Sequence, residues 1–177
     1  MPDTPFRLQW FSTLIAPRTT GRILEVGCGN GQLLELLAAR CPRAELIGID
    51  RSATQVHRAM QRLVSCSPTP QVEHISGEAA GARWANQPFN LIVAMNVNFA
   101  WTDPEAAGLA LRQLLAPRGR VLLGFEPPST NGLAAFRRKL TNAAALAGFA
   151  VHAEHEPEES VTRVFAMEWR PVPRRAR

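Results

Sequence analysis

The 177-residue sequence contains little cysteine and almost no lysine. Its three cysteines, Cys28, Cys41 and Cys66, are too few and too scattered for a disulfide framework or a zinc site. This usage favours a reducing, cytoplasmic setting. Lys139 is the only lysine among 20 basic residues. Because arginine supplies nearly all of the net charge of +5 and Ala and Pro are abundant, we interpret the bias as that of a GC-rich genome rather than of a binding function.

Long hydrophobic runs and metal-binding motifs are also missing. No apolar run approaches the roughly 20 residues needed to span a bilayer. The first eleven residues lack the charged start and apolar core of a secretion signal. The sequence has no H-E-x-x-H, no C-x-x-C and no carboxylate cluster with metal-ligand spacing. We therefore expect neither a membrane protein nor a metal-dependent one.

Strand-like and helix-like segments alternate from residue 22 onward, the pattern typical of a parallel sheet covered on both faces. Strands are predicted over residues 22–26, 44–50, 72–75, 89–95, 120–125, 149–155 and 161–169. Helices are predicted over residues 31–40, 52–64, 103–116 and 130–147. The hydrophilic residues 156–159 suit a hairpin, which would make the last strand antiparallel. We expect an α/β fold with an open twisted sheet, mostly parallel, and helices on both faces.

Three glycines at alternate positions mark the end of the first predicted strand. Gly27, Gly29 and Gly31 follow Glu25 in the run Glu-Val-Gly-Cys-Gly-Asn-Gly. Glycines this closely spaced indicate a backbone that turns tightly and lets a ligand approach very near. A dinucleotide fingerprint, G-x-G-x-x-G, would need its third glycine where Gln32 stands. A nicotinamide-linked oxidoreductase is therefore disfavoured.

This run resembles the first motif of the class I methyltransferases that use S-adenosylmethionine. The resemblance covers roughly residues 20–170 and includes Asp50, residues 77–79, residues 115–119 and residues 147–149. It implies a Rossmann-like fold, S-adenosylmethionine as cofactor and S-adenosylhomocysteine as its product. One position departs from the family pattern: Asn90 stands where the family usually carries Asp, a residue that mainly organises local backbone.

The resemblance also implies a set of cofactor-binding residues near the carboxyl ends of the strands. Glu25 would offset the ammonium charge of the methionine moiety, and Asp50 would accept both ribose hydroxyls, with a helix-capping role as its alternative. Glu78 would accept the adenine amino group, and Ala79 would offer its backbone N–H to the ring. The expected set is Glu25, Gly27, Cys28, Gly29, Gly31, Asp50, Arg51, Glu78, Ala79, Met95 and Asn96.

The methyl acceptor would meet the loops after the fourth and fifth strands. The residues expected to contact it are Asn98, Phe99, Trp101 and Glu126. Methyltransferases of nucleobase or glutamine amides carry an Asn/Asp-Pro-Pro-aromatic motif here, whereas residues 96–101 contain no proline. This difference speaks against such acceptors. No histidine falls in this loop, so the sequence identifies no catalytic base.

The chain ends lie outside this pattern. Phe6, Trp10, Phe11, Leu14 and Ile15 recur at helical spacing and predict one amphipathic helix. By the resemblance such a helix can cover the cofactor cleft as a lid, and plain packing against the sheet is the alternative. We expect three parts: this helix over residues 1–20, the methyltransferase domain over 21–170 and a basic tail over 171–177.

Three functions stay open at this point. A small-molecule acceptor is favoured because the catalytic domain consumes almost the whole chain and leaves no separate substrate domain. An RNA or protein methyltransferase would use the basic tail together with residues 137–139. A catalytically silent module that binds S-adenosylmethionine is the third, because no catalytic base is evident. The oligomeric state is not indicated.

Overall fold

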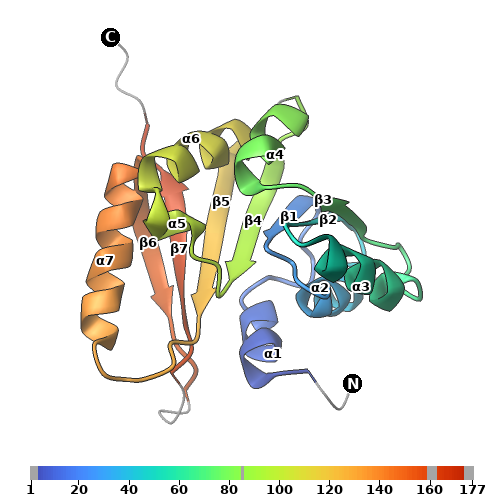
Figure 1. Cartoon of the computed structure of the whole chain (residues 1–177), viewed down its shortest axis with the longest axis horizontal. Helices are drawn as coiled ribbons and strands as arrows, with labels where there is room; N and C mark the ends of the chain where they lie inside the picture. The colour runs from blue at the N-terminus through green and yellow to red at the C-terminus, as the bar shows by residue number, and fades with distance from the viewer. Residues whose placement is uncertain (1–3, 85, 159–162, 174–177) are drawn as a thin grey trace.

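The computed structural model describes residues 4–84, 86–158 and 163–173. Within them, seven strands form one sheet in the order β3-β2-β1-β4-β5-β7-β6 (Figure 1). The strands are β1 (Gly21–Val26), β2 (Ala44–Asp50), β3 (Gln71–His74), β4 (Phe89–Met95), β5 (Leu115–Phe125), β6 (Phe149–His155) and β7 (Phe165–Pro171). Strands β1 to β5 pair in parallel, whereas β7 is antiparallel to both β5 and β6. The predicted fold class is confirmed.

Helices cover both faces of the sheet (Figure 1). They are α1 (Phe6–Thr13), α2 (Gln32–Arg40), α3 (Ala53–Leu63), α4 (Gly77–Arg83), α5 (Phe99–Thr102), α6 (Pro104–Leu114) and α7 (Leu133–Leu146). Ile23 and Leu24 are both fully buried, yet they belong to two different cores because successive side chains of a strand point to opposite faces. One core contains the apolar faces of α1, α2 and α3, and the other those of α4, α6 and α7.

Local capping chemistry explains where several helices begin and end. The Asp103 carboxylate accepts a hydrogen bond from the Ala106 N–H at 3.0 Å, and Pro104 occupies the first turn of α6. These are the favoured residues for the two positions. Gly148 follows α7 with φ +76° and donates its N–H to the Ala145 carbonyl, as a C-terminal glycine cap does.

Some predicted boundaries are wrong. Short helices α4 and α5 were not predicted, and the helix expected to reach residue 116 ends at Leu114. Strand β5 begins at Leu115 because Leu115 already pairs with Phe89, and residues 117–119, whose Pro-Arg-Gly sequence is typical of a turn, form an irregularity inside the paired strand. Leu146 of α7 is 62% exposed, whereas Leu140, Ala143 and Ala144 of the same helix are buried.

The N-terminal helix is present, but its buried stripe differs from the predicted one. Leu8, Phe11 and Ile15 are buried, whereas Phe6 is 46% exposed. The Phe11 ring lies so close to Gly124 of β5 that a Cβ there would sit 2.6 Å from its Cδ2 atom. This contact sets the rotation of α1 about its axis and turns Phe6 outward.

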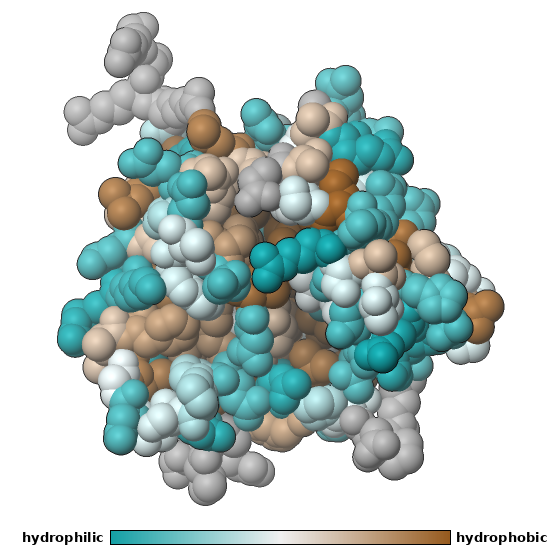
Figure 2. Space-filling view, viewed as in Figure 1, coloured by the Kyte–Doolittle hydropathy of each residue, from teal (hydrophilic) through white to brown (hydrophobic). Residues whose placement is uncertain are grey.

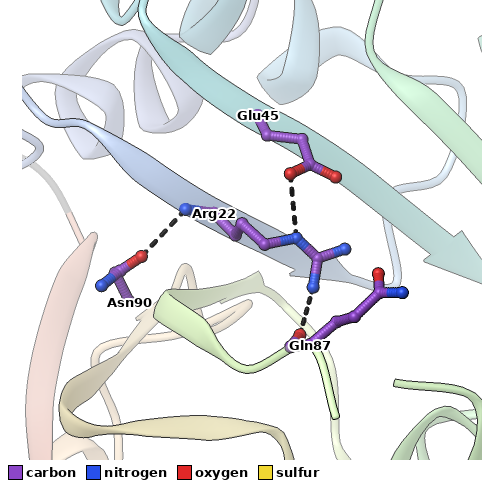
Figure 3. A network of polar contacts seen from close by, with 4 residues as sticks. All are labelled: Arg22, Glu45, Gln87 and Asn90. Atoms are coloured by element: carbon purple, nitrogen blue, oxygen red, sulfur yellow. Dashed lines mark hydrogen bonds and ion pairs between the residues drawn. The ribbon is translucent and has the colours of Figure 1, made fainter. Parts of the chain in front are cut away.

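Asn90, the departure from the family pattern, lies at the start of β4 beside the start of β1 (Figure 3). Its Oδ1 atom accepts the Arg22 backbone N–H at 2.9 Å, and the Arg22 side chain bonds Glu45 at 3.0 Å and the Gln87 carbonyl. Gly21 has φ +84°, and a Cβ at this position would collide with the Asn90 amide. The side chain at this position thus organises local backbone, in the place where the family's Asp is expected to do so.

Candidate active site

The strand order reverses between β1 and β4, and a cavity of about 720 Å³ opens at the carboxyl ends of β1, β2 and β4. Crevices at such reversals are where open α/β sheets bind ligands. Figure 2 shows the surface hollowed near the centre of the view, with apolar side chains in its depth. Seven of the predicted site residues line the cavity: Gly27, Asp50, Arg51, Met95, Asn96, Asn98 and Phe99.

The glycine loop begins at Gly27, where the chain leaves β1. Gly27 and Cys28 donate their N–H groups to the Ile49 carbonyl at 2.8 and 3.0 Å, which fixes the loop against β2. Gly27 has φ +71°, and a Cβ would come within 2.6 Å of Val97. Gly29 has φ +52°, but nothing lies within 4 Å of the position that its Cβ would occupy. Gly29 is therefore free of packing constraints and borders open space.

Gly31 and Cys28 are buried, and of the predicted residues in this loop Gly27 alone is in the lining of the cavity. Gly31 is buried at the start of α2 with φ +79°, and a Cβ there would lie 3.1 Å from that of Ala59 in α3. Its glycine serves the contact between two helices. Cys28 is buried, and desolvation together with the carboxylates of Glu25 and Asp50 raises the pKa of its thiol. A thiol held protonated in this way is not a nucleophile.

Asp50 joins the end of β2 to the glycine loop. Its Oδ2 atom accepts the Gly29 N–H at 2.9 Å, and its Oδ1 atom accepts the Ser52 N–H at 2.8 Å. The cap of α3 is Ser52, whose hydroxyl accepts the Gln55 N–H, so helix capping is not the role of Asp50. Because a carboxylate has about four lone-pair positions, Asp50 keeps capacity for two further donors.

Glu25 is a buried carboxyl group in β1, two residues before the glycine loop begins. It is 3% exposed, and its Oε2 atom is buried with no hydrogen-bond partner among the described residues. Burial, and to a lesser degree the negative charge of Asp50, raise the pKa of Glu25 well above its usual value, against the effect of a Leu34 backbone N–H. An orphaned carboxylate oxygen is costly unless a donor from outside the chain completes it.

The third predicted contact region follows β3. Ser76 is the N-cap of α4 and lines the cavity, and its hydroxyl accepts the Ala79 N–H at 3.3 Å. The backbone donor of Ala79, expected to reach an adenine ring, is therefore engaged within the helix, and Ala79 does not line the cavity. Glu78 lies in the first turn of α4, and its side chain is outside the described part of the structure.

Asn96 lies at the junction of the ends of β4 and β5. It adopts φ +57°, a left-handed conformation uncommon for residues other than glycine. Its N–H donates to the Gly124 carbonyl at 2.9 Å, and its Oδ1 atom accepts the Glu126 N–H at 2.7 Å. Both loops are thereby held at fixed positions relative to each other. A strained residue that is over-determined in this way is often part of a functional site.

A second cavity of about 420 Å³ shares Asn96 with the first. It contains Trp101 and Glu126 of the predicted acceptor residues, whereas Asn98 and Phe99 belong to the first cavity. Phe125 and Phe136 also line it and were not predicted as site residues. They were missed because Phe125 ends a buried strand and Phe136 follows a helical apolar pattern, so each predicts core packing from sequence alone.

Sequence reasoning also missed Arg7 of α1. Its Nη1 atom lies 3.1 Å from the Glu126 Oε2 atom, and both side chains are about one-third exposed. The ion pair joins the N-terminal helix to the edge of the second cavity across 119 positions of sequence. No local signal in a helix of this kind indicates such a distant partner. The lid role of the helix stays a prediction.

Neither metal ligation nor a membrane span emerges from the described residues. They contain no group of three or more His, Cys, Asp or Glu side chains placed to hold a metal ion. None of the helices in the described part of the chain is both long enough and apolar enough to cross a bilayer.

Sequence comparison identifies the class of this chain. The model of the family described as "Methyltransferase domain" matches residues 23–119, more than half of the chain, and the chain belongs to that family. The predicted class, that of S-adenosylmethionine-dependent methyltransferases, is confirmed, and S-adenosylmethionine is the cofactor that this membership implies.

Among individual relatives, a trans-aconitate 2-methyltransferase of Yersinia pestis (strain Pestoides F) is 40% identical over 99 residues, which are 55% of this chain and 35% of the relative. One of Rhodopseudomonas palustris (strain BisB5) is 38% identical over 88 residues, 50% of this chain and 30% of the relative. The match thus spans about a third of the length of these relatives.

Solved structures agree on the fold. A TehB-like methyltransferase of Corynebacterium glutamicum superposes with a TM-score of 0.68 at 18% identity, over 96% of this chain and 89% of that one. The mitomycin 7-O-methyltransferase MmcR gives 0.71 at 13% identity, over 93% and 54% of the two chains. At these identities the likeness establishes the fold alone.

The described residues fit S-adenosylmethionine. The orphaned Glu25 Oε2 atom is a ready partner for an ammonium group, and the open space beside Gly29 leaves room for a ligand to touch backbone. Asp50 keeps acceptor capacity for hydroxyls at the cavity wall. These three features lie at the carboxyl ends of β1 and β2, where the sequence predicted them.

Proposed function

We propose that the protein transfers a methyl group from S-adenosylmethionine to a small-molecule acceptor by in-line displacement. The observation that carries the proposal is a pair of cavities, of about 720 and 420 Å³, that share the lining residue Asn96. Two ligands placed end to end would have their reacting atoms near this residue. Family membership and relatives named for a small-molecule substrate support the same function.

The bound cofactor would supply an activated methyl group on a positively charged sulfur. The residues of the chain then have three tasks. Glu25 and Asp50 would bind the ammonium and hydroxyl groups of the cofactor and so fix its orientation. Asn96, held by Gly124 and by the Glu126 backbone, would keep the two cavities aligned. Positioning and exclusion of water account for most of the acceleration in a reaction of this kind.

Of the three basic residues 137–139 on α7, the first is paired within the chain. Arg137, which an RNA methyltransferase was expected to use, forms ion pairs with Glu154 at 2.9 Å and with Glu156. Its charge is thereby largely neutralised. Residues 174–177 of the basic tail lie outside the described residues.

Calorimetric titration with S-adenosylmethionine, with NADH as the parallel control, is the first test. Micromolar binding of S-adenosylmethionine alone supports the proposal, and absence of binding contradicts it. Methyl transfer from labelled S-adenosylmethionine is then measured on a panel of small molecules that includes trans-aconitate, and on total RNA and total protein as comparison. Labelling of RNA or protein but of no small molecule would contradict the choice of acceptor. Binding without any transfer would favour a silent module.

A further inference from the structure

Three aromatic rings form a wall of the second cavity. Trp101 of α5 meets Phe125 at the end of β5 and Phe136 of α7, with 5.2 Å between ring centroids in both pairs. Phe125 and Phe136 are 5.4 Å apart at an interplanar angle of 84°. The rings come from three separate elements, so the fold itself assembles them. Their edge-to-face packing is the favourable arrangement for aromatic side chains, and it fixes the shape of the wall.

The charge of this cavity is as informative as its wall. Among the described residues that line it, no side chain is cationic, and the only charged one is Glu126. Two arginines bind lining residues without being part of the lining: Arg7 pairs with Glu126, and Arg163 donates to the Pro128 carbonyl. A polyanionic ligand would meet the Glu126 carboxylate in this wall, and like charges repel each other.

Glu126 nevertheless keeps one oxygen for a ligand. Its Oε2 atom accepts from Arg7, while Oε1 has no hydrogen-bond partner among the residues that the structure describes. The backbone of Glu126 is fixed by Asn96, so the carboxylate starts from a defined position at the junction of the two cavities. A hydroxyl donor on the ligand is the natural partner for such an oxygen.

We propose that the methyl acceptor is a flat, uncharged aromatic molecule with a hydroxyl group, bound against Trp101, Phe125 and Phe136 with its hydroxyl on Glu126. This rests on the proposed function and names its substrate class. In the transfer, the acceptor oxygen forms a bond to the methyl carbon while the carbon–sulfur bond breaks, and its electron pair stays on sulfur, which becomes a neutral thioether. The hydroxyl proton passes to the Glu126 carboxylate and from there to water.

The test measures binding and transfer separately. Protein saturated with S-adenosylhomocysteine is titrated at pH 7 with 2-naphthol and, in parallel, with trans-aconitate. We expect binding of 2-naphthol and none of trans-aconitate. Binding of trans-aconitate but not of 2-naphthol would overturn the proposal and leave the methyltransferase function standing. Failure of S-adenosylhomocysteine itself to bind would instead contradict the proposed function, and with it this assignment of the acceptor.

Variants of Trp101 test the aromatic wall. Trp101→Leu removes the ring but keeps an apolar side chain, and we expect the Kd of 2-naphthol to rise about tenfold or more. Trp101→Phe retains an aromatic face and should restore most of the affinity. An unchanged Kd in Trp101→Leu would overturn the proposal. Binding of S-adenosylhomocysteine, measured in each variant, reports whether the fold and the first cavity are intact.

Glu126→Gln tests the partner of the hydroxyl. We expect the rate of methyl transfer to 2-naphthol to fall by about 10²-fold, the lower end for loss of general base catalysis. Binding of S-adenosylhomocysteine should not change. The loss should be largest near pH 7 and shrink as pH approaches the pKa of the phenol, since the ionised acceptor needs no base. A pH-independent loss would indicate a merely structural role and overturn the assignment.

Discussion

Glu25 offers the sharpest test of the cofactor site. Its carboxyl is 3% exposed and its Oε2 atom is unpartnered among the described residues. Burial and the neighbouring Asp50 raise the pKa of Glu25 well above its usual value. Glu25→Gln keeps the shape of the side chain and removes its charge. We therefore expect the variant, without ligand, to be more stable than the natural protein at high pH.

The sign follows from proton linkage. A carboxyl whose pKa is raised on folding holds its proton more tightly in the folded state than in the unfolded chain. The stabilisation from this tighter proton binding is complete at pH values below the pKa of a glutamate in the unfolded chain, about 4.3. It is lost as the pH rises through the raised pKa of Glu25 in the folded protein. Gln does not titrate, so the difference in stability between the variant and the natural protein grows over this window.

The magnitude is that of one buried polar group without a partner, about 1–3 kcal/mol. For a chain of this size each kcal/mol shifts the Tm by roughly 2–4 °C. Thermal unfolding at pH 4, below the unfolded pKa, should give nearly equal Tm values, and at pH 8.5 the variant should melt higher. S-adenosylmethionine should bind the variant more weakly, because the ammonium group loses its counter-charge.

Glu45→Gln is the matched control, since Glu45 is exposed and its loss affects only an ion pair with Arg22. It should show no growing advantage at high pH. If Glu25→Gln instead melts below the natural protein at pH 8.5, the Glu25 carboxylate has a partner in the folded protein. Glu25 would then not be the unpartnered carboxyl that a ligand ammonium group completes.

Three further substitutions have defined outcomes. Gly29→Ala should still fold, with a loss of about 1–2 kcal/mol in stability because alanine is strained in this left-handed conformation. Its affinity for S-adenosylmethionine, measured by calorimetry, should fall because the new Cβ occupies the open space that the cofactor would use. An unchanged affinity would remove the glycine loop from the site. Asp50→Ala should weaken cofactor binding by about 1.5–3 kcal/mol and lower the Tm through two lost backbone hydrogen bonds; equal affinity would leave Asp50 a purely structural role. Gly108→Ala should lower the free energy of unfolding, measured with denaturant, by about 1–3 kcal/mol, because the new Cβ would lie 2.3 Å from the Ala147 carbonyl oxygen. Leu109→Ala is the control: Leu109 is exposed, so this change should alter stability by less than about 0.5 kcal/mol.

The sequence was most informative where a residue type is required locally. Gly27 and Gly29 adopt positive φ values that residues with a Cβ rarely adopt, and Asp103 with Pro104 begins α6 as expected. Short elements were missed because a single turn such as α5 has no room for a helical period. Boundaries inside β5 were wrong because strand pairing, which extends back to Leu115, overrides the local signal of a turn.

The acceptor side of the site depended on tertiary contacts. Sequence reasoning named Trp101 and Glu126, because both follow predicted elements at the carboxyl edge of the sheet. It did not find Phe125, Phe136 or Arg7, since their sequence patterns are those of a core strand, a core helix face and a surface helix. The contact between α7 and the end of β5 brings Phe125 and Phe136 to one cavity, and Arg7 of α1 reaches that cavity only through its ion pair with Glu126.

The sequence by itself determined the order of strands and helices, the glycine loop and its acidic neighbours, and thereby the family. These features depend on backbone conformation and on a hydrophobic period, both of which are local properties of the chain. The tertiary structure decided the rest: it buried the Glu25 Oε2 atom with no partner among the described residues, bonded Asp50 to Gly29, and placed Asn96 in the lining of two cavities. These features depend on contacts between segments that are far apart in the sequence, and local sequence patterns do not show which segments meet.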